Sequence, residues 1–480
     1  MTLLRAIRIV RHAAKLVAPY GMVRRLYGRE ADGRNLLRDA LPFFVSDCIW
    51  GRKAPDIAAI AAHQRDVAAR LAVKIRSGSP LRVVFLVTNN ALFPARPLFD
   101  AMLRDAAFDP SIAVIPELRW KFDSPEPAME KCHAELSRTV PRDRLVLVRR
   151  DERGRWSDVT GGADIVCFPL PYDDIYNPSY SPRRALERDF LAICANYGFY
   201  RSIYDRALMA ADFYAYMWKA FFECEDTLAE YRENSQTKGA NAALTGYIKM
   251  DALADAIADR EGRASARPHR EGRASARPSS SLSKRKNILV ALHHSVEDGT
   301  NAELSLANFE RYAEYFMRLP DRFPEVDFTF RPHPFLLKII SNPLRWGAEK
   351  ANAYFAELKA KHNVAWSDGG DYFAEFAASD ACIQDCGSYL VEYFYTKKPC
   401  CYMLKSPDDI GAKFAPLGKK CLANCYISYD TDAIDAFIRD VVVSGRDPMK
   451  GQREAFADSI MVNYPRAAQA AIEEILRCSS

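Results

Sequence analysis

Four short segments in the second half of the chain carry side chains that could bind and transfer a phosphate group. Three follow apolar runs and the fourth closes a helical pattern: His293-His294-Ser295, Arg331-Pro332-His333-Pro334, Asp385-Cys386-Gly387-Ser388 and Lys397-Lys398-Pro399. An arginine binds a phosphate through two parallel hydrogen bonds. A histidine titrates near neutrality, so it can take a proton from an attacking hydroxyl. The set predicts an anion site with a proton acceptor beside it.

The third of these segments is expected to begin a helix near Gly387 or Ser388. The free N–H groups and the positive dipole end of such a helix favour an anion, and glycine allows close approach. Glu392 lies one turn beyond Ser388 and can accept hydrogen bonds from a ribose. We therefore predict that a nucleotide and its phosphates are bound by His293, Arg331, His333, Asp385, Gly387, Ser388 and Glu392.

Each of these residues also has a purely structural interpretation. Asp385 and Ser388 could only cap a helix. The pair His293-His294 could be turn residues, and Arg331 could form a surface ion pair. Their joint occurrence at three successive strand ends favours the functional interpretation.

Apolar runs that alternate with helical patterns must position these side chains. In the first half, the runs are 82–90, 111–115, 144–148, 163–172 and 190–198; in the second half, they are 287–295, 326–334, 363–368, 381–387 and 400–404. Between the halves, about 204–234 is predicted to be one long helical stretch. Short buried strands between helices are typical of parallel sheets covered on both faces. We expect two doubly wound, Rossmann-like α/β domains, with ligands bound in the cleft beyond the strand ends.

The predicted domain boundaries follow changes in composition. We expect a basic helical extension at 1–80, a first domain at 81–258, a linker at 259–286, a second domain at 287–449, and a last helix at 450–480 that crosses back to the first domain. The sequence REGRASARP occurs at 260–268 and again at 270–278. Without apolar residues larger than alanine it cannot bury a core, which predicts a disordered linker. A basic arm that contacts phosphate or lipid is the alternative.

The net charge of +5 comes from two local segments. Residues 1–30 carry +6 and residues 260–286 carry +7, so the rest carries −8. A body with that charge argues against a nucleic-acid partner. Within 3–18, apolar and basic side chains fall on separate helical stripes, which predicts an amphipathic helix lying on an anionic membrane surface or docked on its own body.

Several other classes are excluded by the same inspection. No apolar run is long enough to span a membrane, and the first residues lack the pattern of a secretory signal. Twelve cysteines are too sparse for a disulfide scaffold and predict reduced thiols in the cytoplasm. Carboxylates do not cluster at metal-ligand spacing. A zinc site from Cys382, Cys386, Cys421 and Cys425 would need a turn, because strand residues four apart lie about 13 Å from one another. We expect no metal and no cofactor.

The run 379–399, SDACIQDCGSYLVEYFYTKKP, resembles the CDP-glycerol glycerophosphotransferase family, the teichoic-acid type transferases. Asp385, Ser388, Glu392 and Lys398-Pro399 match its motif, and FRPHP matches its His-Pro motif. NAALTGYIKMD and LHHS resemble two further family segments, so the likeness spans about 190–405. The resemblance implies a GT-B fold, a nucleotide held by the C-terminal domain, and transfer from a CDP-activated polyol.

The sequence departs from the family pattern at two places. Cys386-Gly387 replaces Tyr-Ser, which removes a hydroxyl from the phosphate site. The family's Trp-His-Gly motif, whose histidine is a proposed general base, corresponds here to Ala195-Asn196-Tyr197-Gly198. The base is therefore expected elsewhere. We favour His294 over Asp173 or Asp174, because a carboxylate would need a raised pKa.

The expected function is transfer of glycerol or ribitol phosphate from a CDP-activated donor to a hydroxyl of a cell-surface polysaccharide or lipid-linked acceptor. Arg331, His333 and the helix start at Ser388 would stabilise the developing charge. One alternative is a GT-B glycosyltransferase that uses a CMP- or UDP-sugar for capsule or lipopolysaccharide synthesis. A second is a nucleotide-binding scaffold without turnover. The expected location is the cytoplasm, at the inner face of the cell membrane.

Overall fold

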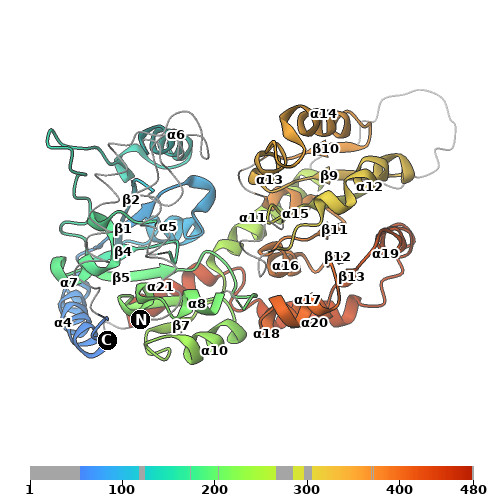
Figure 1. The fold of residues 1–480 in the computed structure, drawn as a ribbon. Helices are drawn as coiled ribbons and strands as arrows, with labels where there is room; N and C mark the ends of the chain where they lie inside the picture. Colours follow the sequence, from blue (N-terminus) through green and yellow to red (C-terminus); the bar gives the residue numbers. More distant parts are fainter. Residues whose placement is uncertain are drawn as a thin grey trace, which may run out of the picture.

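The computed structural model describes residues 54–117, 125–172, 175–203, 205–265, 285–296, 305–368, 370 and 372–477. The predictions for the helix at 3–18, for most of the duplicated segment, and for Asp173 and Asp174 lie outside the described residues. Figure 1 shows the described part as two α/β units side by side, joined by α11 (Asp251–Ser265).

Seven parallel strands form the sheet of the first domain, in the order β3-β2-β1-β4-β5-β6-β7. They are β1 (Leu81–Val87), β2 (Phe108–Val114), β3 (Leu145–Leu147), β4 (Ile165–Cys167), β5 (Leu191–Ala195), β6 (Lys219–Phe222) and β7 (Ala242–Leu244). Six of the seven residues of β1 are buried because helices cover both faces of the sheet, as expected for parallel strands.

Six parallel strands form the sheet of the second domain, in the order β10-β9-β8-β11-β12-β13. They are β8 (Lys286–Ala291), β9 (Val326–Phe330), β10 (Val364–Trp366), β11 (Ala381–Gln384), β12 (Cys400–Met403) and β13 (Tyr426–Ser428). The predicted fold class, two doubly wound α/β domains, is confirmed.

The prediction of a single helical stretch over 204–234 is wrong. This segment contains α8 (Asp205–Met209), α9 (Asp212–Ala215), β6 and α10 (Glu225–Asn234). The strand is only four residues long, and short apolar runs between helices have no periodicity that separates strand from helix. The strand β6 matters for the candidate site because a buried carboxyl group follows it directly.

The first domain is covered by helices from both ends of the described chain. These are α4 (Ile57–Arg76), α5 (Arg96–Leu103), α6 (Glu126–Leu136), α7 (Ala185–Arg188) and, from the C-terminal end, α21 (Ala467–Arg477). The buried side chains of α21 belong to the first core. Figure 1 accordingly shows this red helix among the blue and green elements. The carboxylate of Asp251 accepts hydrogen bonds from the first two N–H groups of α21, at 3.1 and 2.8 Å.

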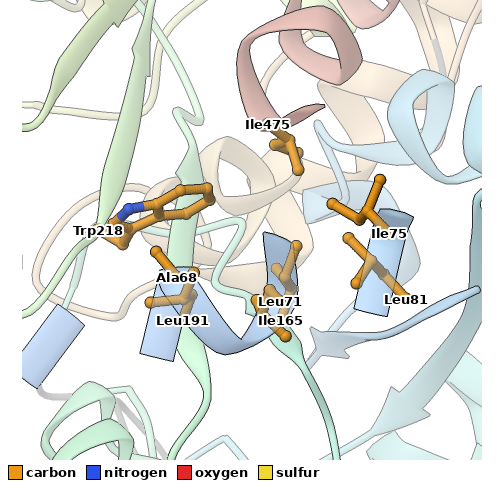
Figure 2. Close-up of a pocket in the computed structure, with 8 residues that line it drawn as sticks. All are labelled: Ala68, Leu71, Ile75, Leu81, Ile165, Leu191, Trp218 and Ile475. Carbon is orange, nitrogen blue, oxygen red and sulfur yellow. The ribbon is translucent and has the colours of Figure 1, made fainter. Parts of the chain in front are cut away.

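A small apolar cavity lies between α4, α21 and the first sheet (Figure 2). Its lining includes Leu81, Ile165 and Leu191, which are the first residues of β1, β4 and β5. The cavity is therefore at the amino ends of the strands. Ligands of open α/β sheets bind at the opposite, carboxyl ends, so this cavity is a packing feature and not the candidate site.

The helices of the second domain are α12 (Phe309–Arg322), α13 (Pro334–Ile340), α14 (Gly347–Lys359), α15 (Phe373–Ala378), α16 (Tyr389–Glu392), α17 (Asp408–Lys413), α18 (Pro416–Ala423), α19 (Thr431–Ala436) and α20 (Lys450–Ile460). Among the helices that the structure describes, none is long and apolar enough to cross a membrane.

The two domains touch through a shared apolar cluster. Phe199 and Tyr247 of the first domain pack in it with Tyr395 and Phe414 of the second. A backbone bridge joins Ser202 to Phe414. Phe199 follows β5 and Tyr247 follows β7, so residues beyond the carboxyl ends of the first sheet pack against the second domain here. Figure 1 shows α16 on the side of the second domain that faces the first.

Candidate functional site

Three histidines converge at the carboxyl ends of β8 and β9. These strands are direct neighbours in the sheet, so the loops after them lie side by side. The ring centroids of His294 and His333 are 3.9 Å apart at an interplanar angle of 29°. His293 lies 4.5 Å from His294 and 5.7 Å from His333, centroid to centroid. The sequence predicted these residues separately, and the fold places them in one cluster.

All three imidazoles are held in the neutral form. Burial lowers the pKa of His294, and burial together with His294 lowers the pKa of His333 to about 3. The pKa of His293 is held well below its usual value, first by burial and then by His294, His333 and Arg201. A neutral imidazole at neutral pH has a lone pair that can accept a proton.

The three rings differ in what their Nδ1 atoms contact. Nδ1 of His333 accepts a hydrogen bond from the Phe335 N–H at 3.1 Å. Nδ1 of His293 accepts from the Ser295 N–H at 3.2 Å. Nδ1 of His294 is buried and has no hydrogen-bond partner. A buried polar atom without a partner costs free energy in the folded state and marks a candidate functional position.

Asp385 follows β11 and is fully buried. Its Oδ1 accepts the His293 N–H at 2.7 Å, and its Oδ2 accepts the Asn308 N–H at 2.6 Å. Burial raises the pKa of this carboxyl to about 7, even though the two N–H groups and the Asn308 amide oppose the shift. Asp385 thus holds the backbone of the histidine loop, a role distinct from the helix cap and the phosphate contact considered from the sequence.

The helix α16 begins directly after Ser388, whose side chain makes no capping hydrogen bond. Gly387 precedes it and lies against Arg201 of the first domain. A Cβ at Gly387 would sit 2.5 Å from Nη2 of Arg201. Real Cβ contacts are essentially never this short, so any side chain at this position would displace the end of the arginine.

Arg331 is buried among residues of its own domain. Its guanidinium donates to Glu375 Oε1 at 3.0 Å, to the Gly370 carbonyl at 2.7 Å and to the Tyr389 hydroxyl at 3.2 Å, and it also bonds the Ser367 hydroxyl. These bonds tie the segment after β10 to the start of α16. Contact between Arg331 and a phosphate stays a prediction.

Glu392 joins the two domains. Its Oε1 accepts the Tyr247 hydroxyl at 3.1 Å and Lys249 Nζ at 3.3 Å, both from the first domain. Its Oε2 accepts the Tyr372 hydroxyl. The side chain is 1% exposed. Tyr247 and Lys249 belong to the segment NAALTGYIKMD, which therefore contacts the second domain at the predicted nucleotide site. Ribose binding by Glu392 stays a prediction.

Two residues at the junction have no signal in the sequence. Arg201, three residues beyond Gly198, carries its guanidinium to Gly387 of the second domain. Glu223 follows β6 and is 1% exposed. Its Oε2 accepts the Thr227 hydroxyl at 3.0 Å, and its Oε1 has no partner. Burial raises the pKa of Glu223 to about 8, so this carboxyl is largely protonated at neutral pH.

Metal-binding geometry is not found within the described residues. No group of three or more His, Cys, Asp or Glu side chains there has an arrangement that fits a metal ion. The cysteines of this part of the chain, Cys382, Cys386, Cys421 and Cys425 among them, are buried free thiols.

No family model and no curated protein sequence matches the chain. Solved structures do match. A variant of the wall teichoic acid polymerase TagF is similar over 94% of this chain and 98% of its own, with 12% identity and a TM-score of 0.52. The same variant soaked with CDPG has 12% identity, the same coverage and a TM-score of 0.50.

The UDP-GlcNAc 2-epimerase of Neisseria meningitidis, bound to UDP-GlcNAc, is also similar. It covers 83% of this chain and all of its own, with 12% identity and a TM-score of 0.50. Likeness at such low identity concerns the backbone arrangement alone. The chain has the two-domain α/β fold of these enzymes, the GT-B fold that the sequence resemblance implied.

Proposed function

We propose that the protein is a transferase that moves a polyol phosphate, glycerol or ribitol phosphate, from a CDP-activated donor to a hydroxyl of a surface polysaccharide or lipid-linked acceptor. The observation that carries this proposal is the gathering of His293, His294, His333 and the Gly387-Ser388 helix start at one junction. Ser388 and His333 match motifs of the CDP-glycerol glycerophosphotransferase family and His293-His294 resembles a further segment of it, whereas Gly387 departs from the family pattern. The likeness to TagF, including the structure soaked with CDPG, supports the same class of donor.

In this proposal, the acceptor hydroxyl attacks the phosphorus distal to cytidine. A new phosphorus–oxygen bond forms, the bridging phosphorus–oxygen bond breaks, and CMP leaves with the bonding electron pair. His294 takes the hydroxyl proton, because its ring is neutral. His333 and the N–H groups that begin α16 stabilise the charge on the transferred phosphoryl group. No cofactor is part of this reaction.

A second candidate is transfer of a sugar from a CMP- or UDP-sugar. It is favoured by the likeness to an epimerase bound to UDP-GlcNAc. The same junction would then hold the nucleotide, and the acceptor would attack the anomeric carbon. A scaffold that binds a nucleotide without turnover is the third candidate.

Donor profiling separates the three candidates. The purified protein is incubated with CDP-glycerol, CDP-ribitol, CMP-sialic acid and a panel of UDP-sugars, and released nucleotide is measured. Release of CMP from a CDP-polyol is the expected result. Release of CMP or UDP from a sugar donor would support glycosyl transfer, and binding of nucleotide without release would support the scaffold.

Peripheral association with an anionic membrane is part of the same proposal. Leu344 is 93% exposed, Phe335 56% and Leu337 42%, all within ten residues that follow the His333 motif. The segment 334–361 contains five basic and two acidic residues. Arg345, Lys359 and Lys361 pair with Glu310, Asp368 and Asp321 outside this segment. The exposed apolar side chains therefore carry this part of the proposal, because they suit a lipid surface, where a lipid-linked acceptor would reside.

A further inference from the structure

The loop of the first domain that contains Arg201 is anchored to the second domain by its backbone. The Arg201 carbonyl accepts the Ala415 N–H at 2.9 Å. A Cβ at Gly418 would sit 2.3 Å from that carbonyl oxygen, so glycine permits the contact. The backbone of Ser202 bridges to Phe414. The position of Arg201 relative to the second sheet is therefore set by main-chain contacts and not by its flexible side chain.

The guanidinium of Arg201 uses one of its edges internally. Nη1 donates to the Phe199 carbonyl at 3.2 Å and to Asp205 Oδ2 at 3.4 Å. The opposite edge consists of Nε and Nη2. Nε is buried without a hydrogen-bond partner, and Nη2 lies over Gly387. An Nε–Nη2 edge is one of the two-donor forks with which arginine binds a phosphate.

The surroundings of the Nε–Nη2 edge suit a bound anion, because the nearby carboxylates already have other partners. The positive charge of Arg201 is near enough to His293 to contribute to the lowering of its pKa, after burial and the two other histidines. Asp205 and Glu392 are the nearby carboxylates. Asp205 is engaged through Nη1 and through the N–H groups of Arg201 and Ser202, at 2.9 and 2.8 Å. Glu392 is engaged by Tyr247, Lys249 and Tyr372.

We infer that Arg201 binds the diphosphate group of a nucleoside diphosphate donor at the start of α16, with its Nε–Nη2 edge on the phosphate oxygens. This inference rests on the proposed function and adds a residue that the family motifs do not assign. Arg331, the arginine that the sequence favoured, already pairs with Glu375. Because Arg201 belongs to the first domain, the donor site is complete only when the two domains are in contact.

The test is a set of binding titrations with nucleotides that differ in phosphate number. Cytidine, CMP and CDP, and uridine, UMP and UDP, are titrated into the wild-type chain and the Arg201→Gln and Arg201→Lys variants. For the Gln variant we expect at least a tenfold loss of affinity for the diphosphate, a smaller loss for the monophosphate and none for the nucleoside. The Lys variant should recover part of the loss, because it restores the charge without the fork.

The matched control is Arg206→Gln, which removes a positive charge five residues away. Arg206 pairs with Glu230 at 2.9 Å and is half exposed, so nucleotide affinities should be unchanged. Equal diphosphate-to-monophosphate affinity ratios in the wild type and the Gln variant would overturn the inference. If the Gln variant does not unfold cooperatively, the same comparison of affinity ratios is made with the Lys variant. Failure of both variants to fold would overturn the inference and assign Arg201 a structural role. A wild-type chain that binds none of the six ligands would instead contradict the proposed function.

Discussion

The imidazole rings of His294 and His333 lie stacked, with their centroids 3.9 Å apart. Both residues are half-buried, and burial lowers the pKa of each ring. Two charged imidazoliums at this distance would repel each other, so the pair is stable only with at most one proton. The arrangement is that of a proton acceptor, His294, kept uncharged by burial, beside a second ring whose pKa it lowers.

Replacing His294 should abolish most turnover without unfolding the protein. We expect His294→Asn to lower kcat by about 10²–10⁴-fold, the usual contribution of a general base, with little change in the affinity for the donor. The measurement is nucleotide release at saturating donor. His362→Asn, at an exposed position outside the junction, serves as the control, and full turnover by His294→Asn would disprove the assignment.

The pH dependence of transfer should extend to unusually acidic pH. A free histidine base is lost by protonation near pH 6.5. Because burial lowers the pKa of His294, the acidic limb of the kcat profile should lie below that value. The profile is measured between pH 5 and 8 with the donor identified by profiling. A midpoint at 6.5 or above would show that the base is another group.

Glu223 should make the protein less stable as pH rises. Its pKa is about 8 in the folded chain against an ordinary 4.5, because burial disfavours the charged form. Folding therefore retains a proton that the unfolded chain loses, and the stability present below pH 4.5 is lost as pH rises towards 8. Glu223→Gln cannot ionise. Its free energy of unfolding relative to wild type should increase by about 1.4 kcal/mol per pH unit between pH 5 and 7.5.

Urea unfolding of both proteins at several pH values checks this expectation. Asp66→Asn, on the exposed face of α4, is a control in which a carboxyl group is lost at a site remote from the junction. Parallel stability curves for wild type and Glu223→Gln across the pH range would contradict the prediction.

Arg331 should matter for stability as well as for binding. Removing one partner of a buried ion pair typically costs about 3–5 kcal/mol, so Arg331→Ala should lower the free energy of unfolding by that order. Glu375→Gln should have a smaller effect, because an amide oxygen can still accept the hydrogen bond at 3.0 Å. Thermal unfolding and donor affinity are measured on the same samples. A tenfold loss of affinity with unchanged stability would instead favour direct phosphate contact.

Membrane association should depend on the segment after His333. Leu344→Ser and Phe335→Ser together should reduce sedimentation with vesicles that contain anionic phospholipid, because two exposed apolar side chains no longer enter the interface. Val73→Ser, at another exposed apolar position far along the chain, is the control. Equal sedimentation of the double variant and wild type would remove this segment from the proposal.

The positions at strand ends were predictable because apolar runs locate strands and the polar residue after each run marks its carboxyl end. His293, Arg331 and Asp385 were found in this way. Their partners were not, since the contact of Arg331 with Glu375 and that of Asp385 with the His293 backbone depend on how loops fold over the sheet. Arg201 and Glu223 were missed for related reasons. Arg201 reaches Gly387 only across the domain junction, and Glu223 follows a four-residue strand that sequence periodicity does not reveal.

The chain passes between the two domains twice, once outward through α11 and once back between α20 and α21. Asp251 holds the two passages together, because it begins α11 and bonds the first N–H groups of α21. Two chain connections that are hydrogen-bonded to each other at one point act as a pivot. A rotation of one domain relative to the other would turn about this point and would separate Arg201 from Gly387.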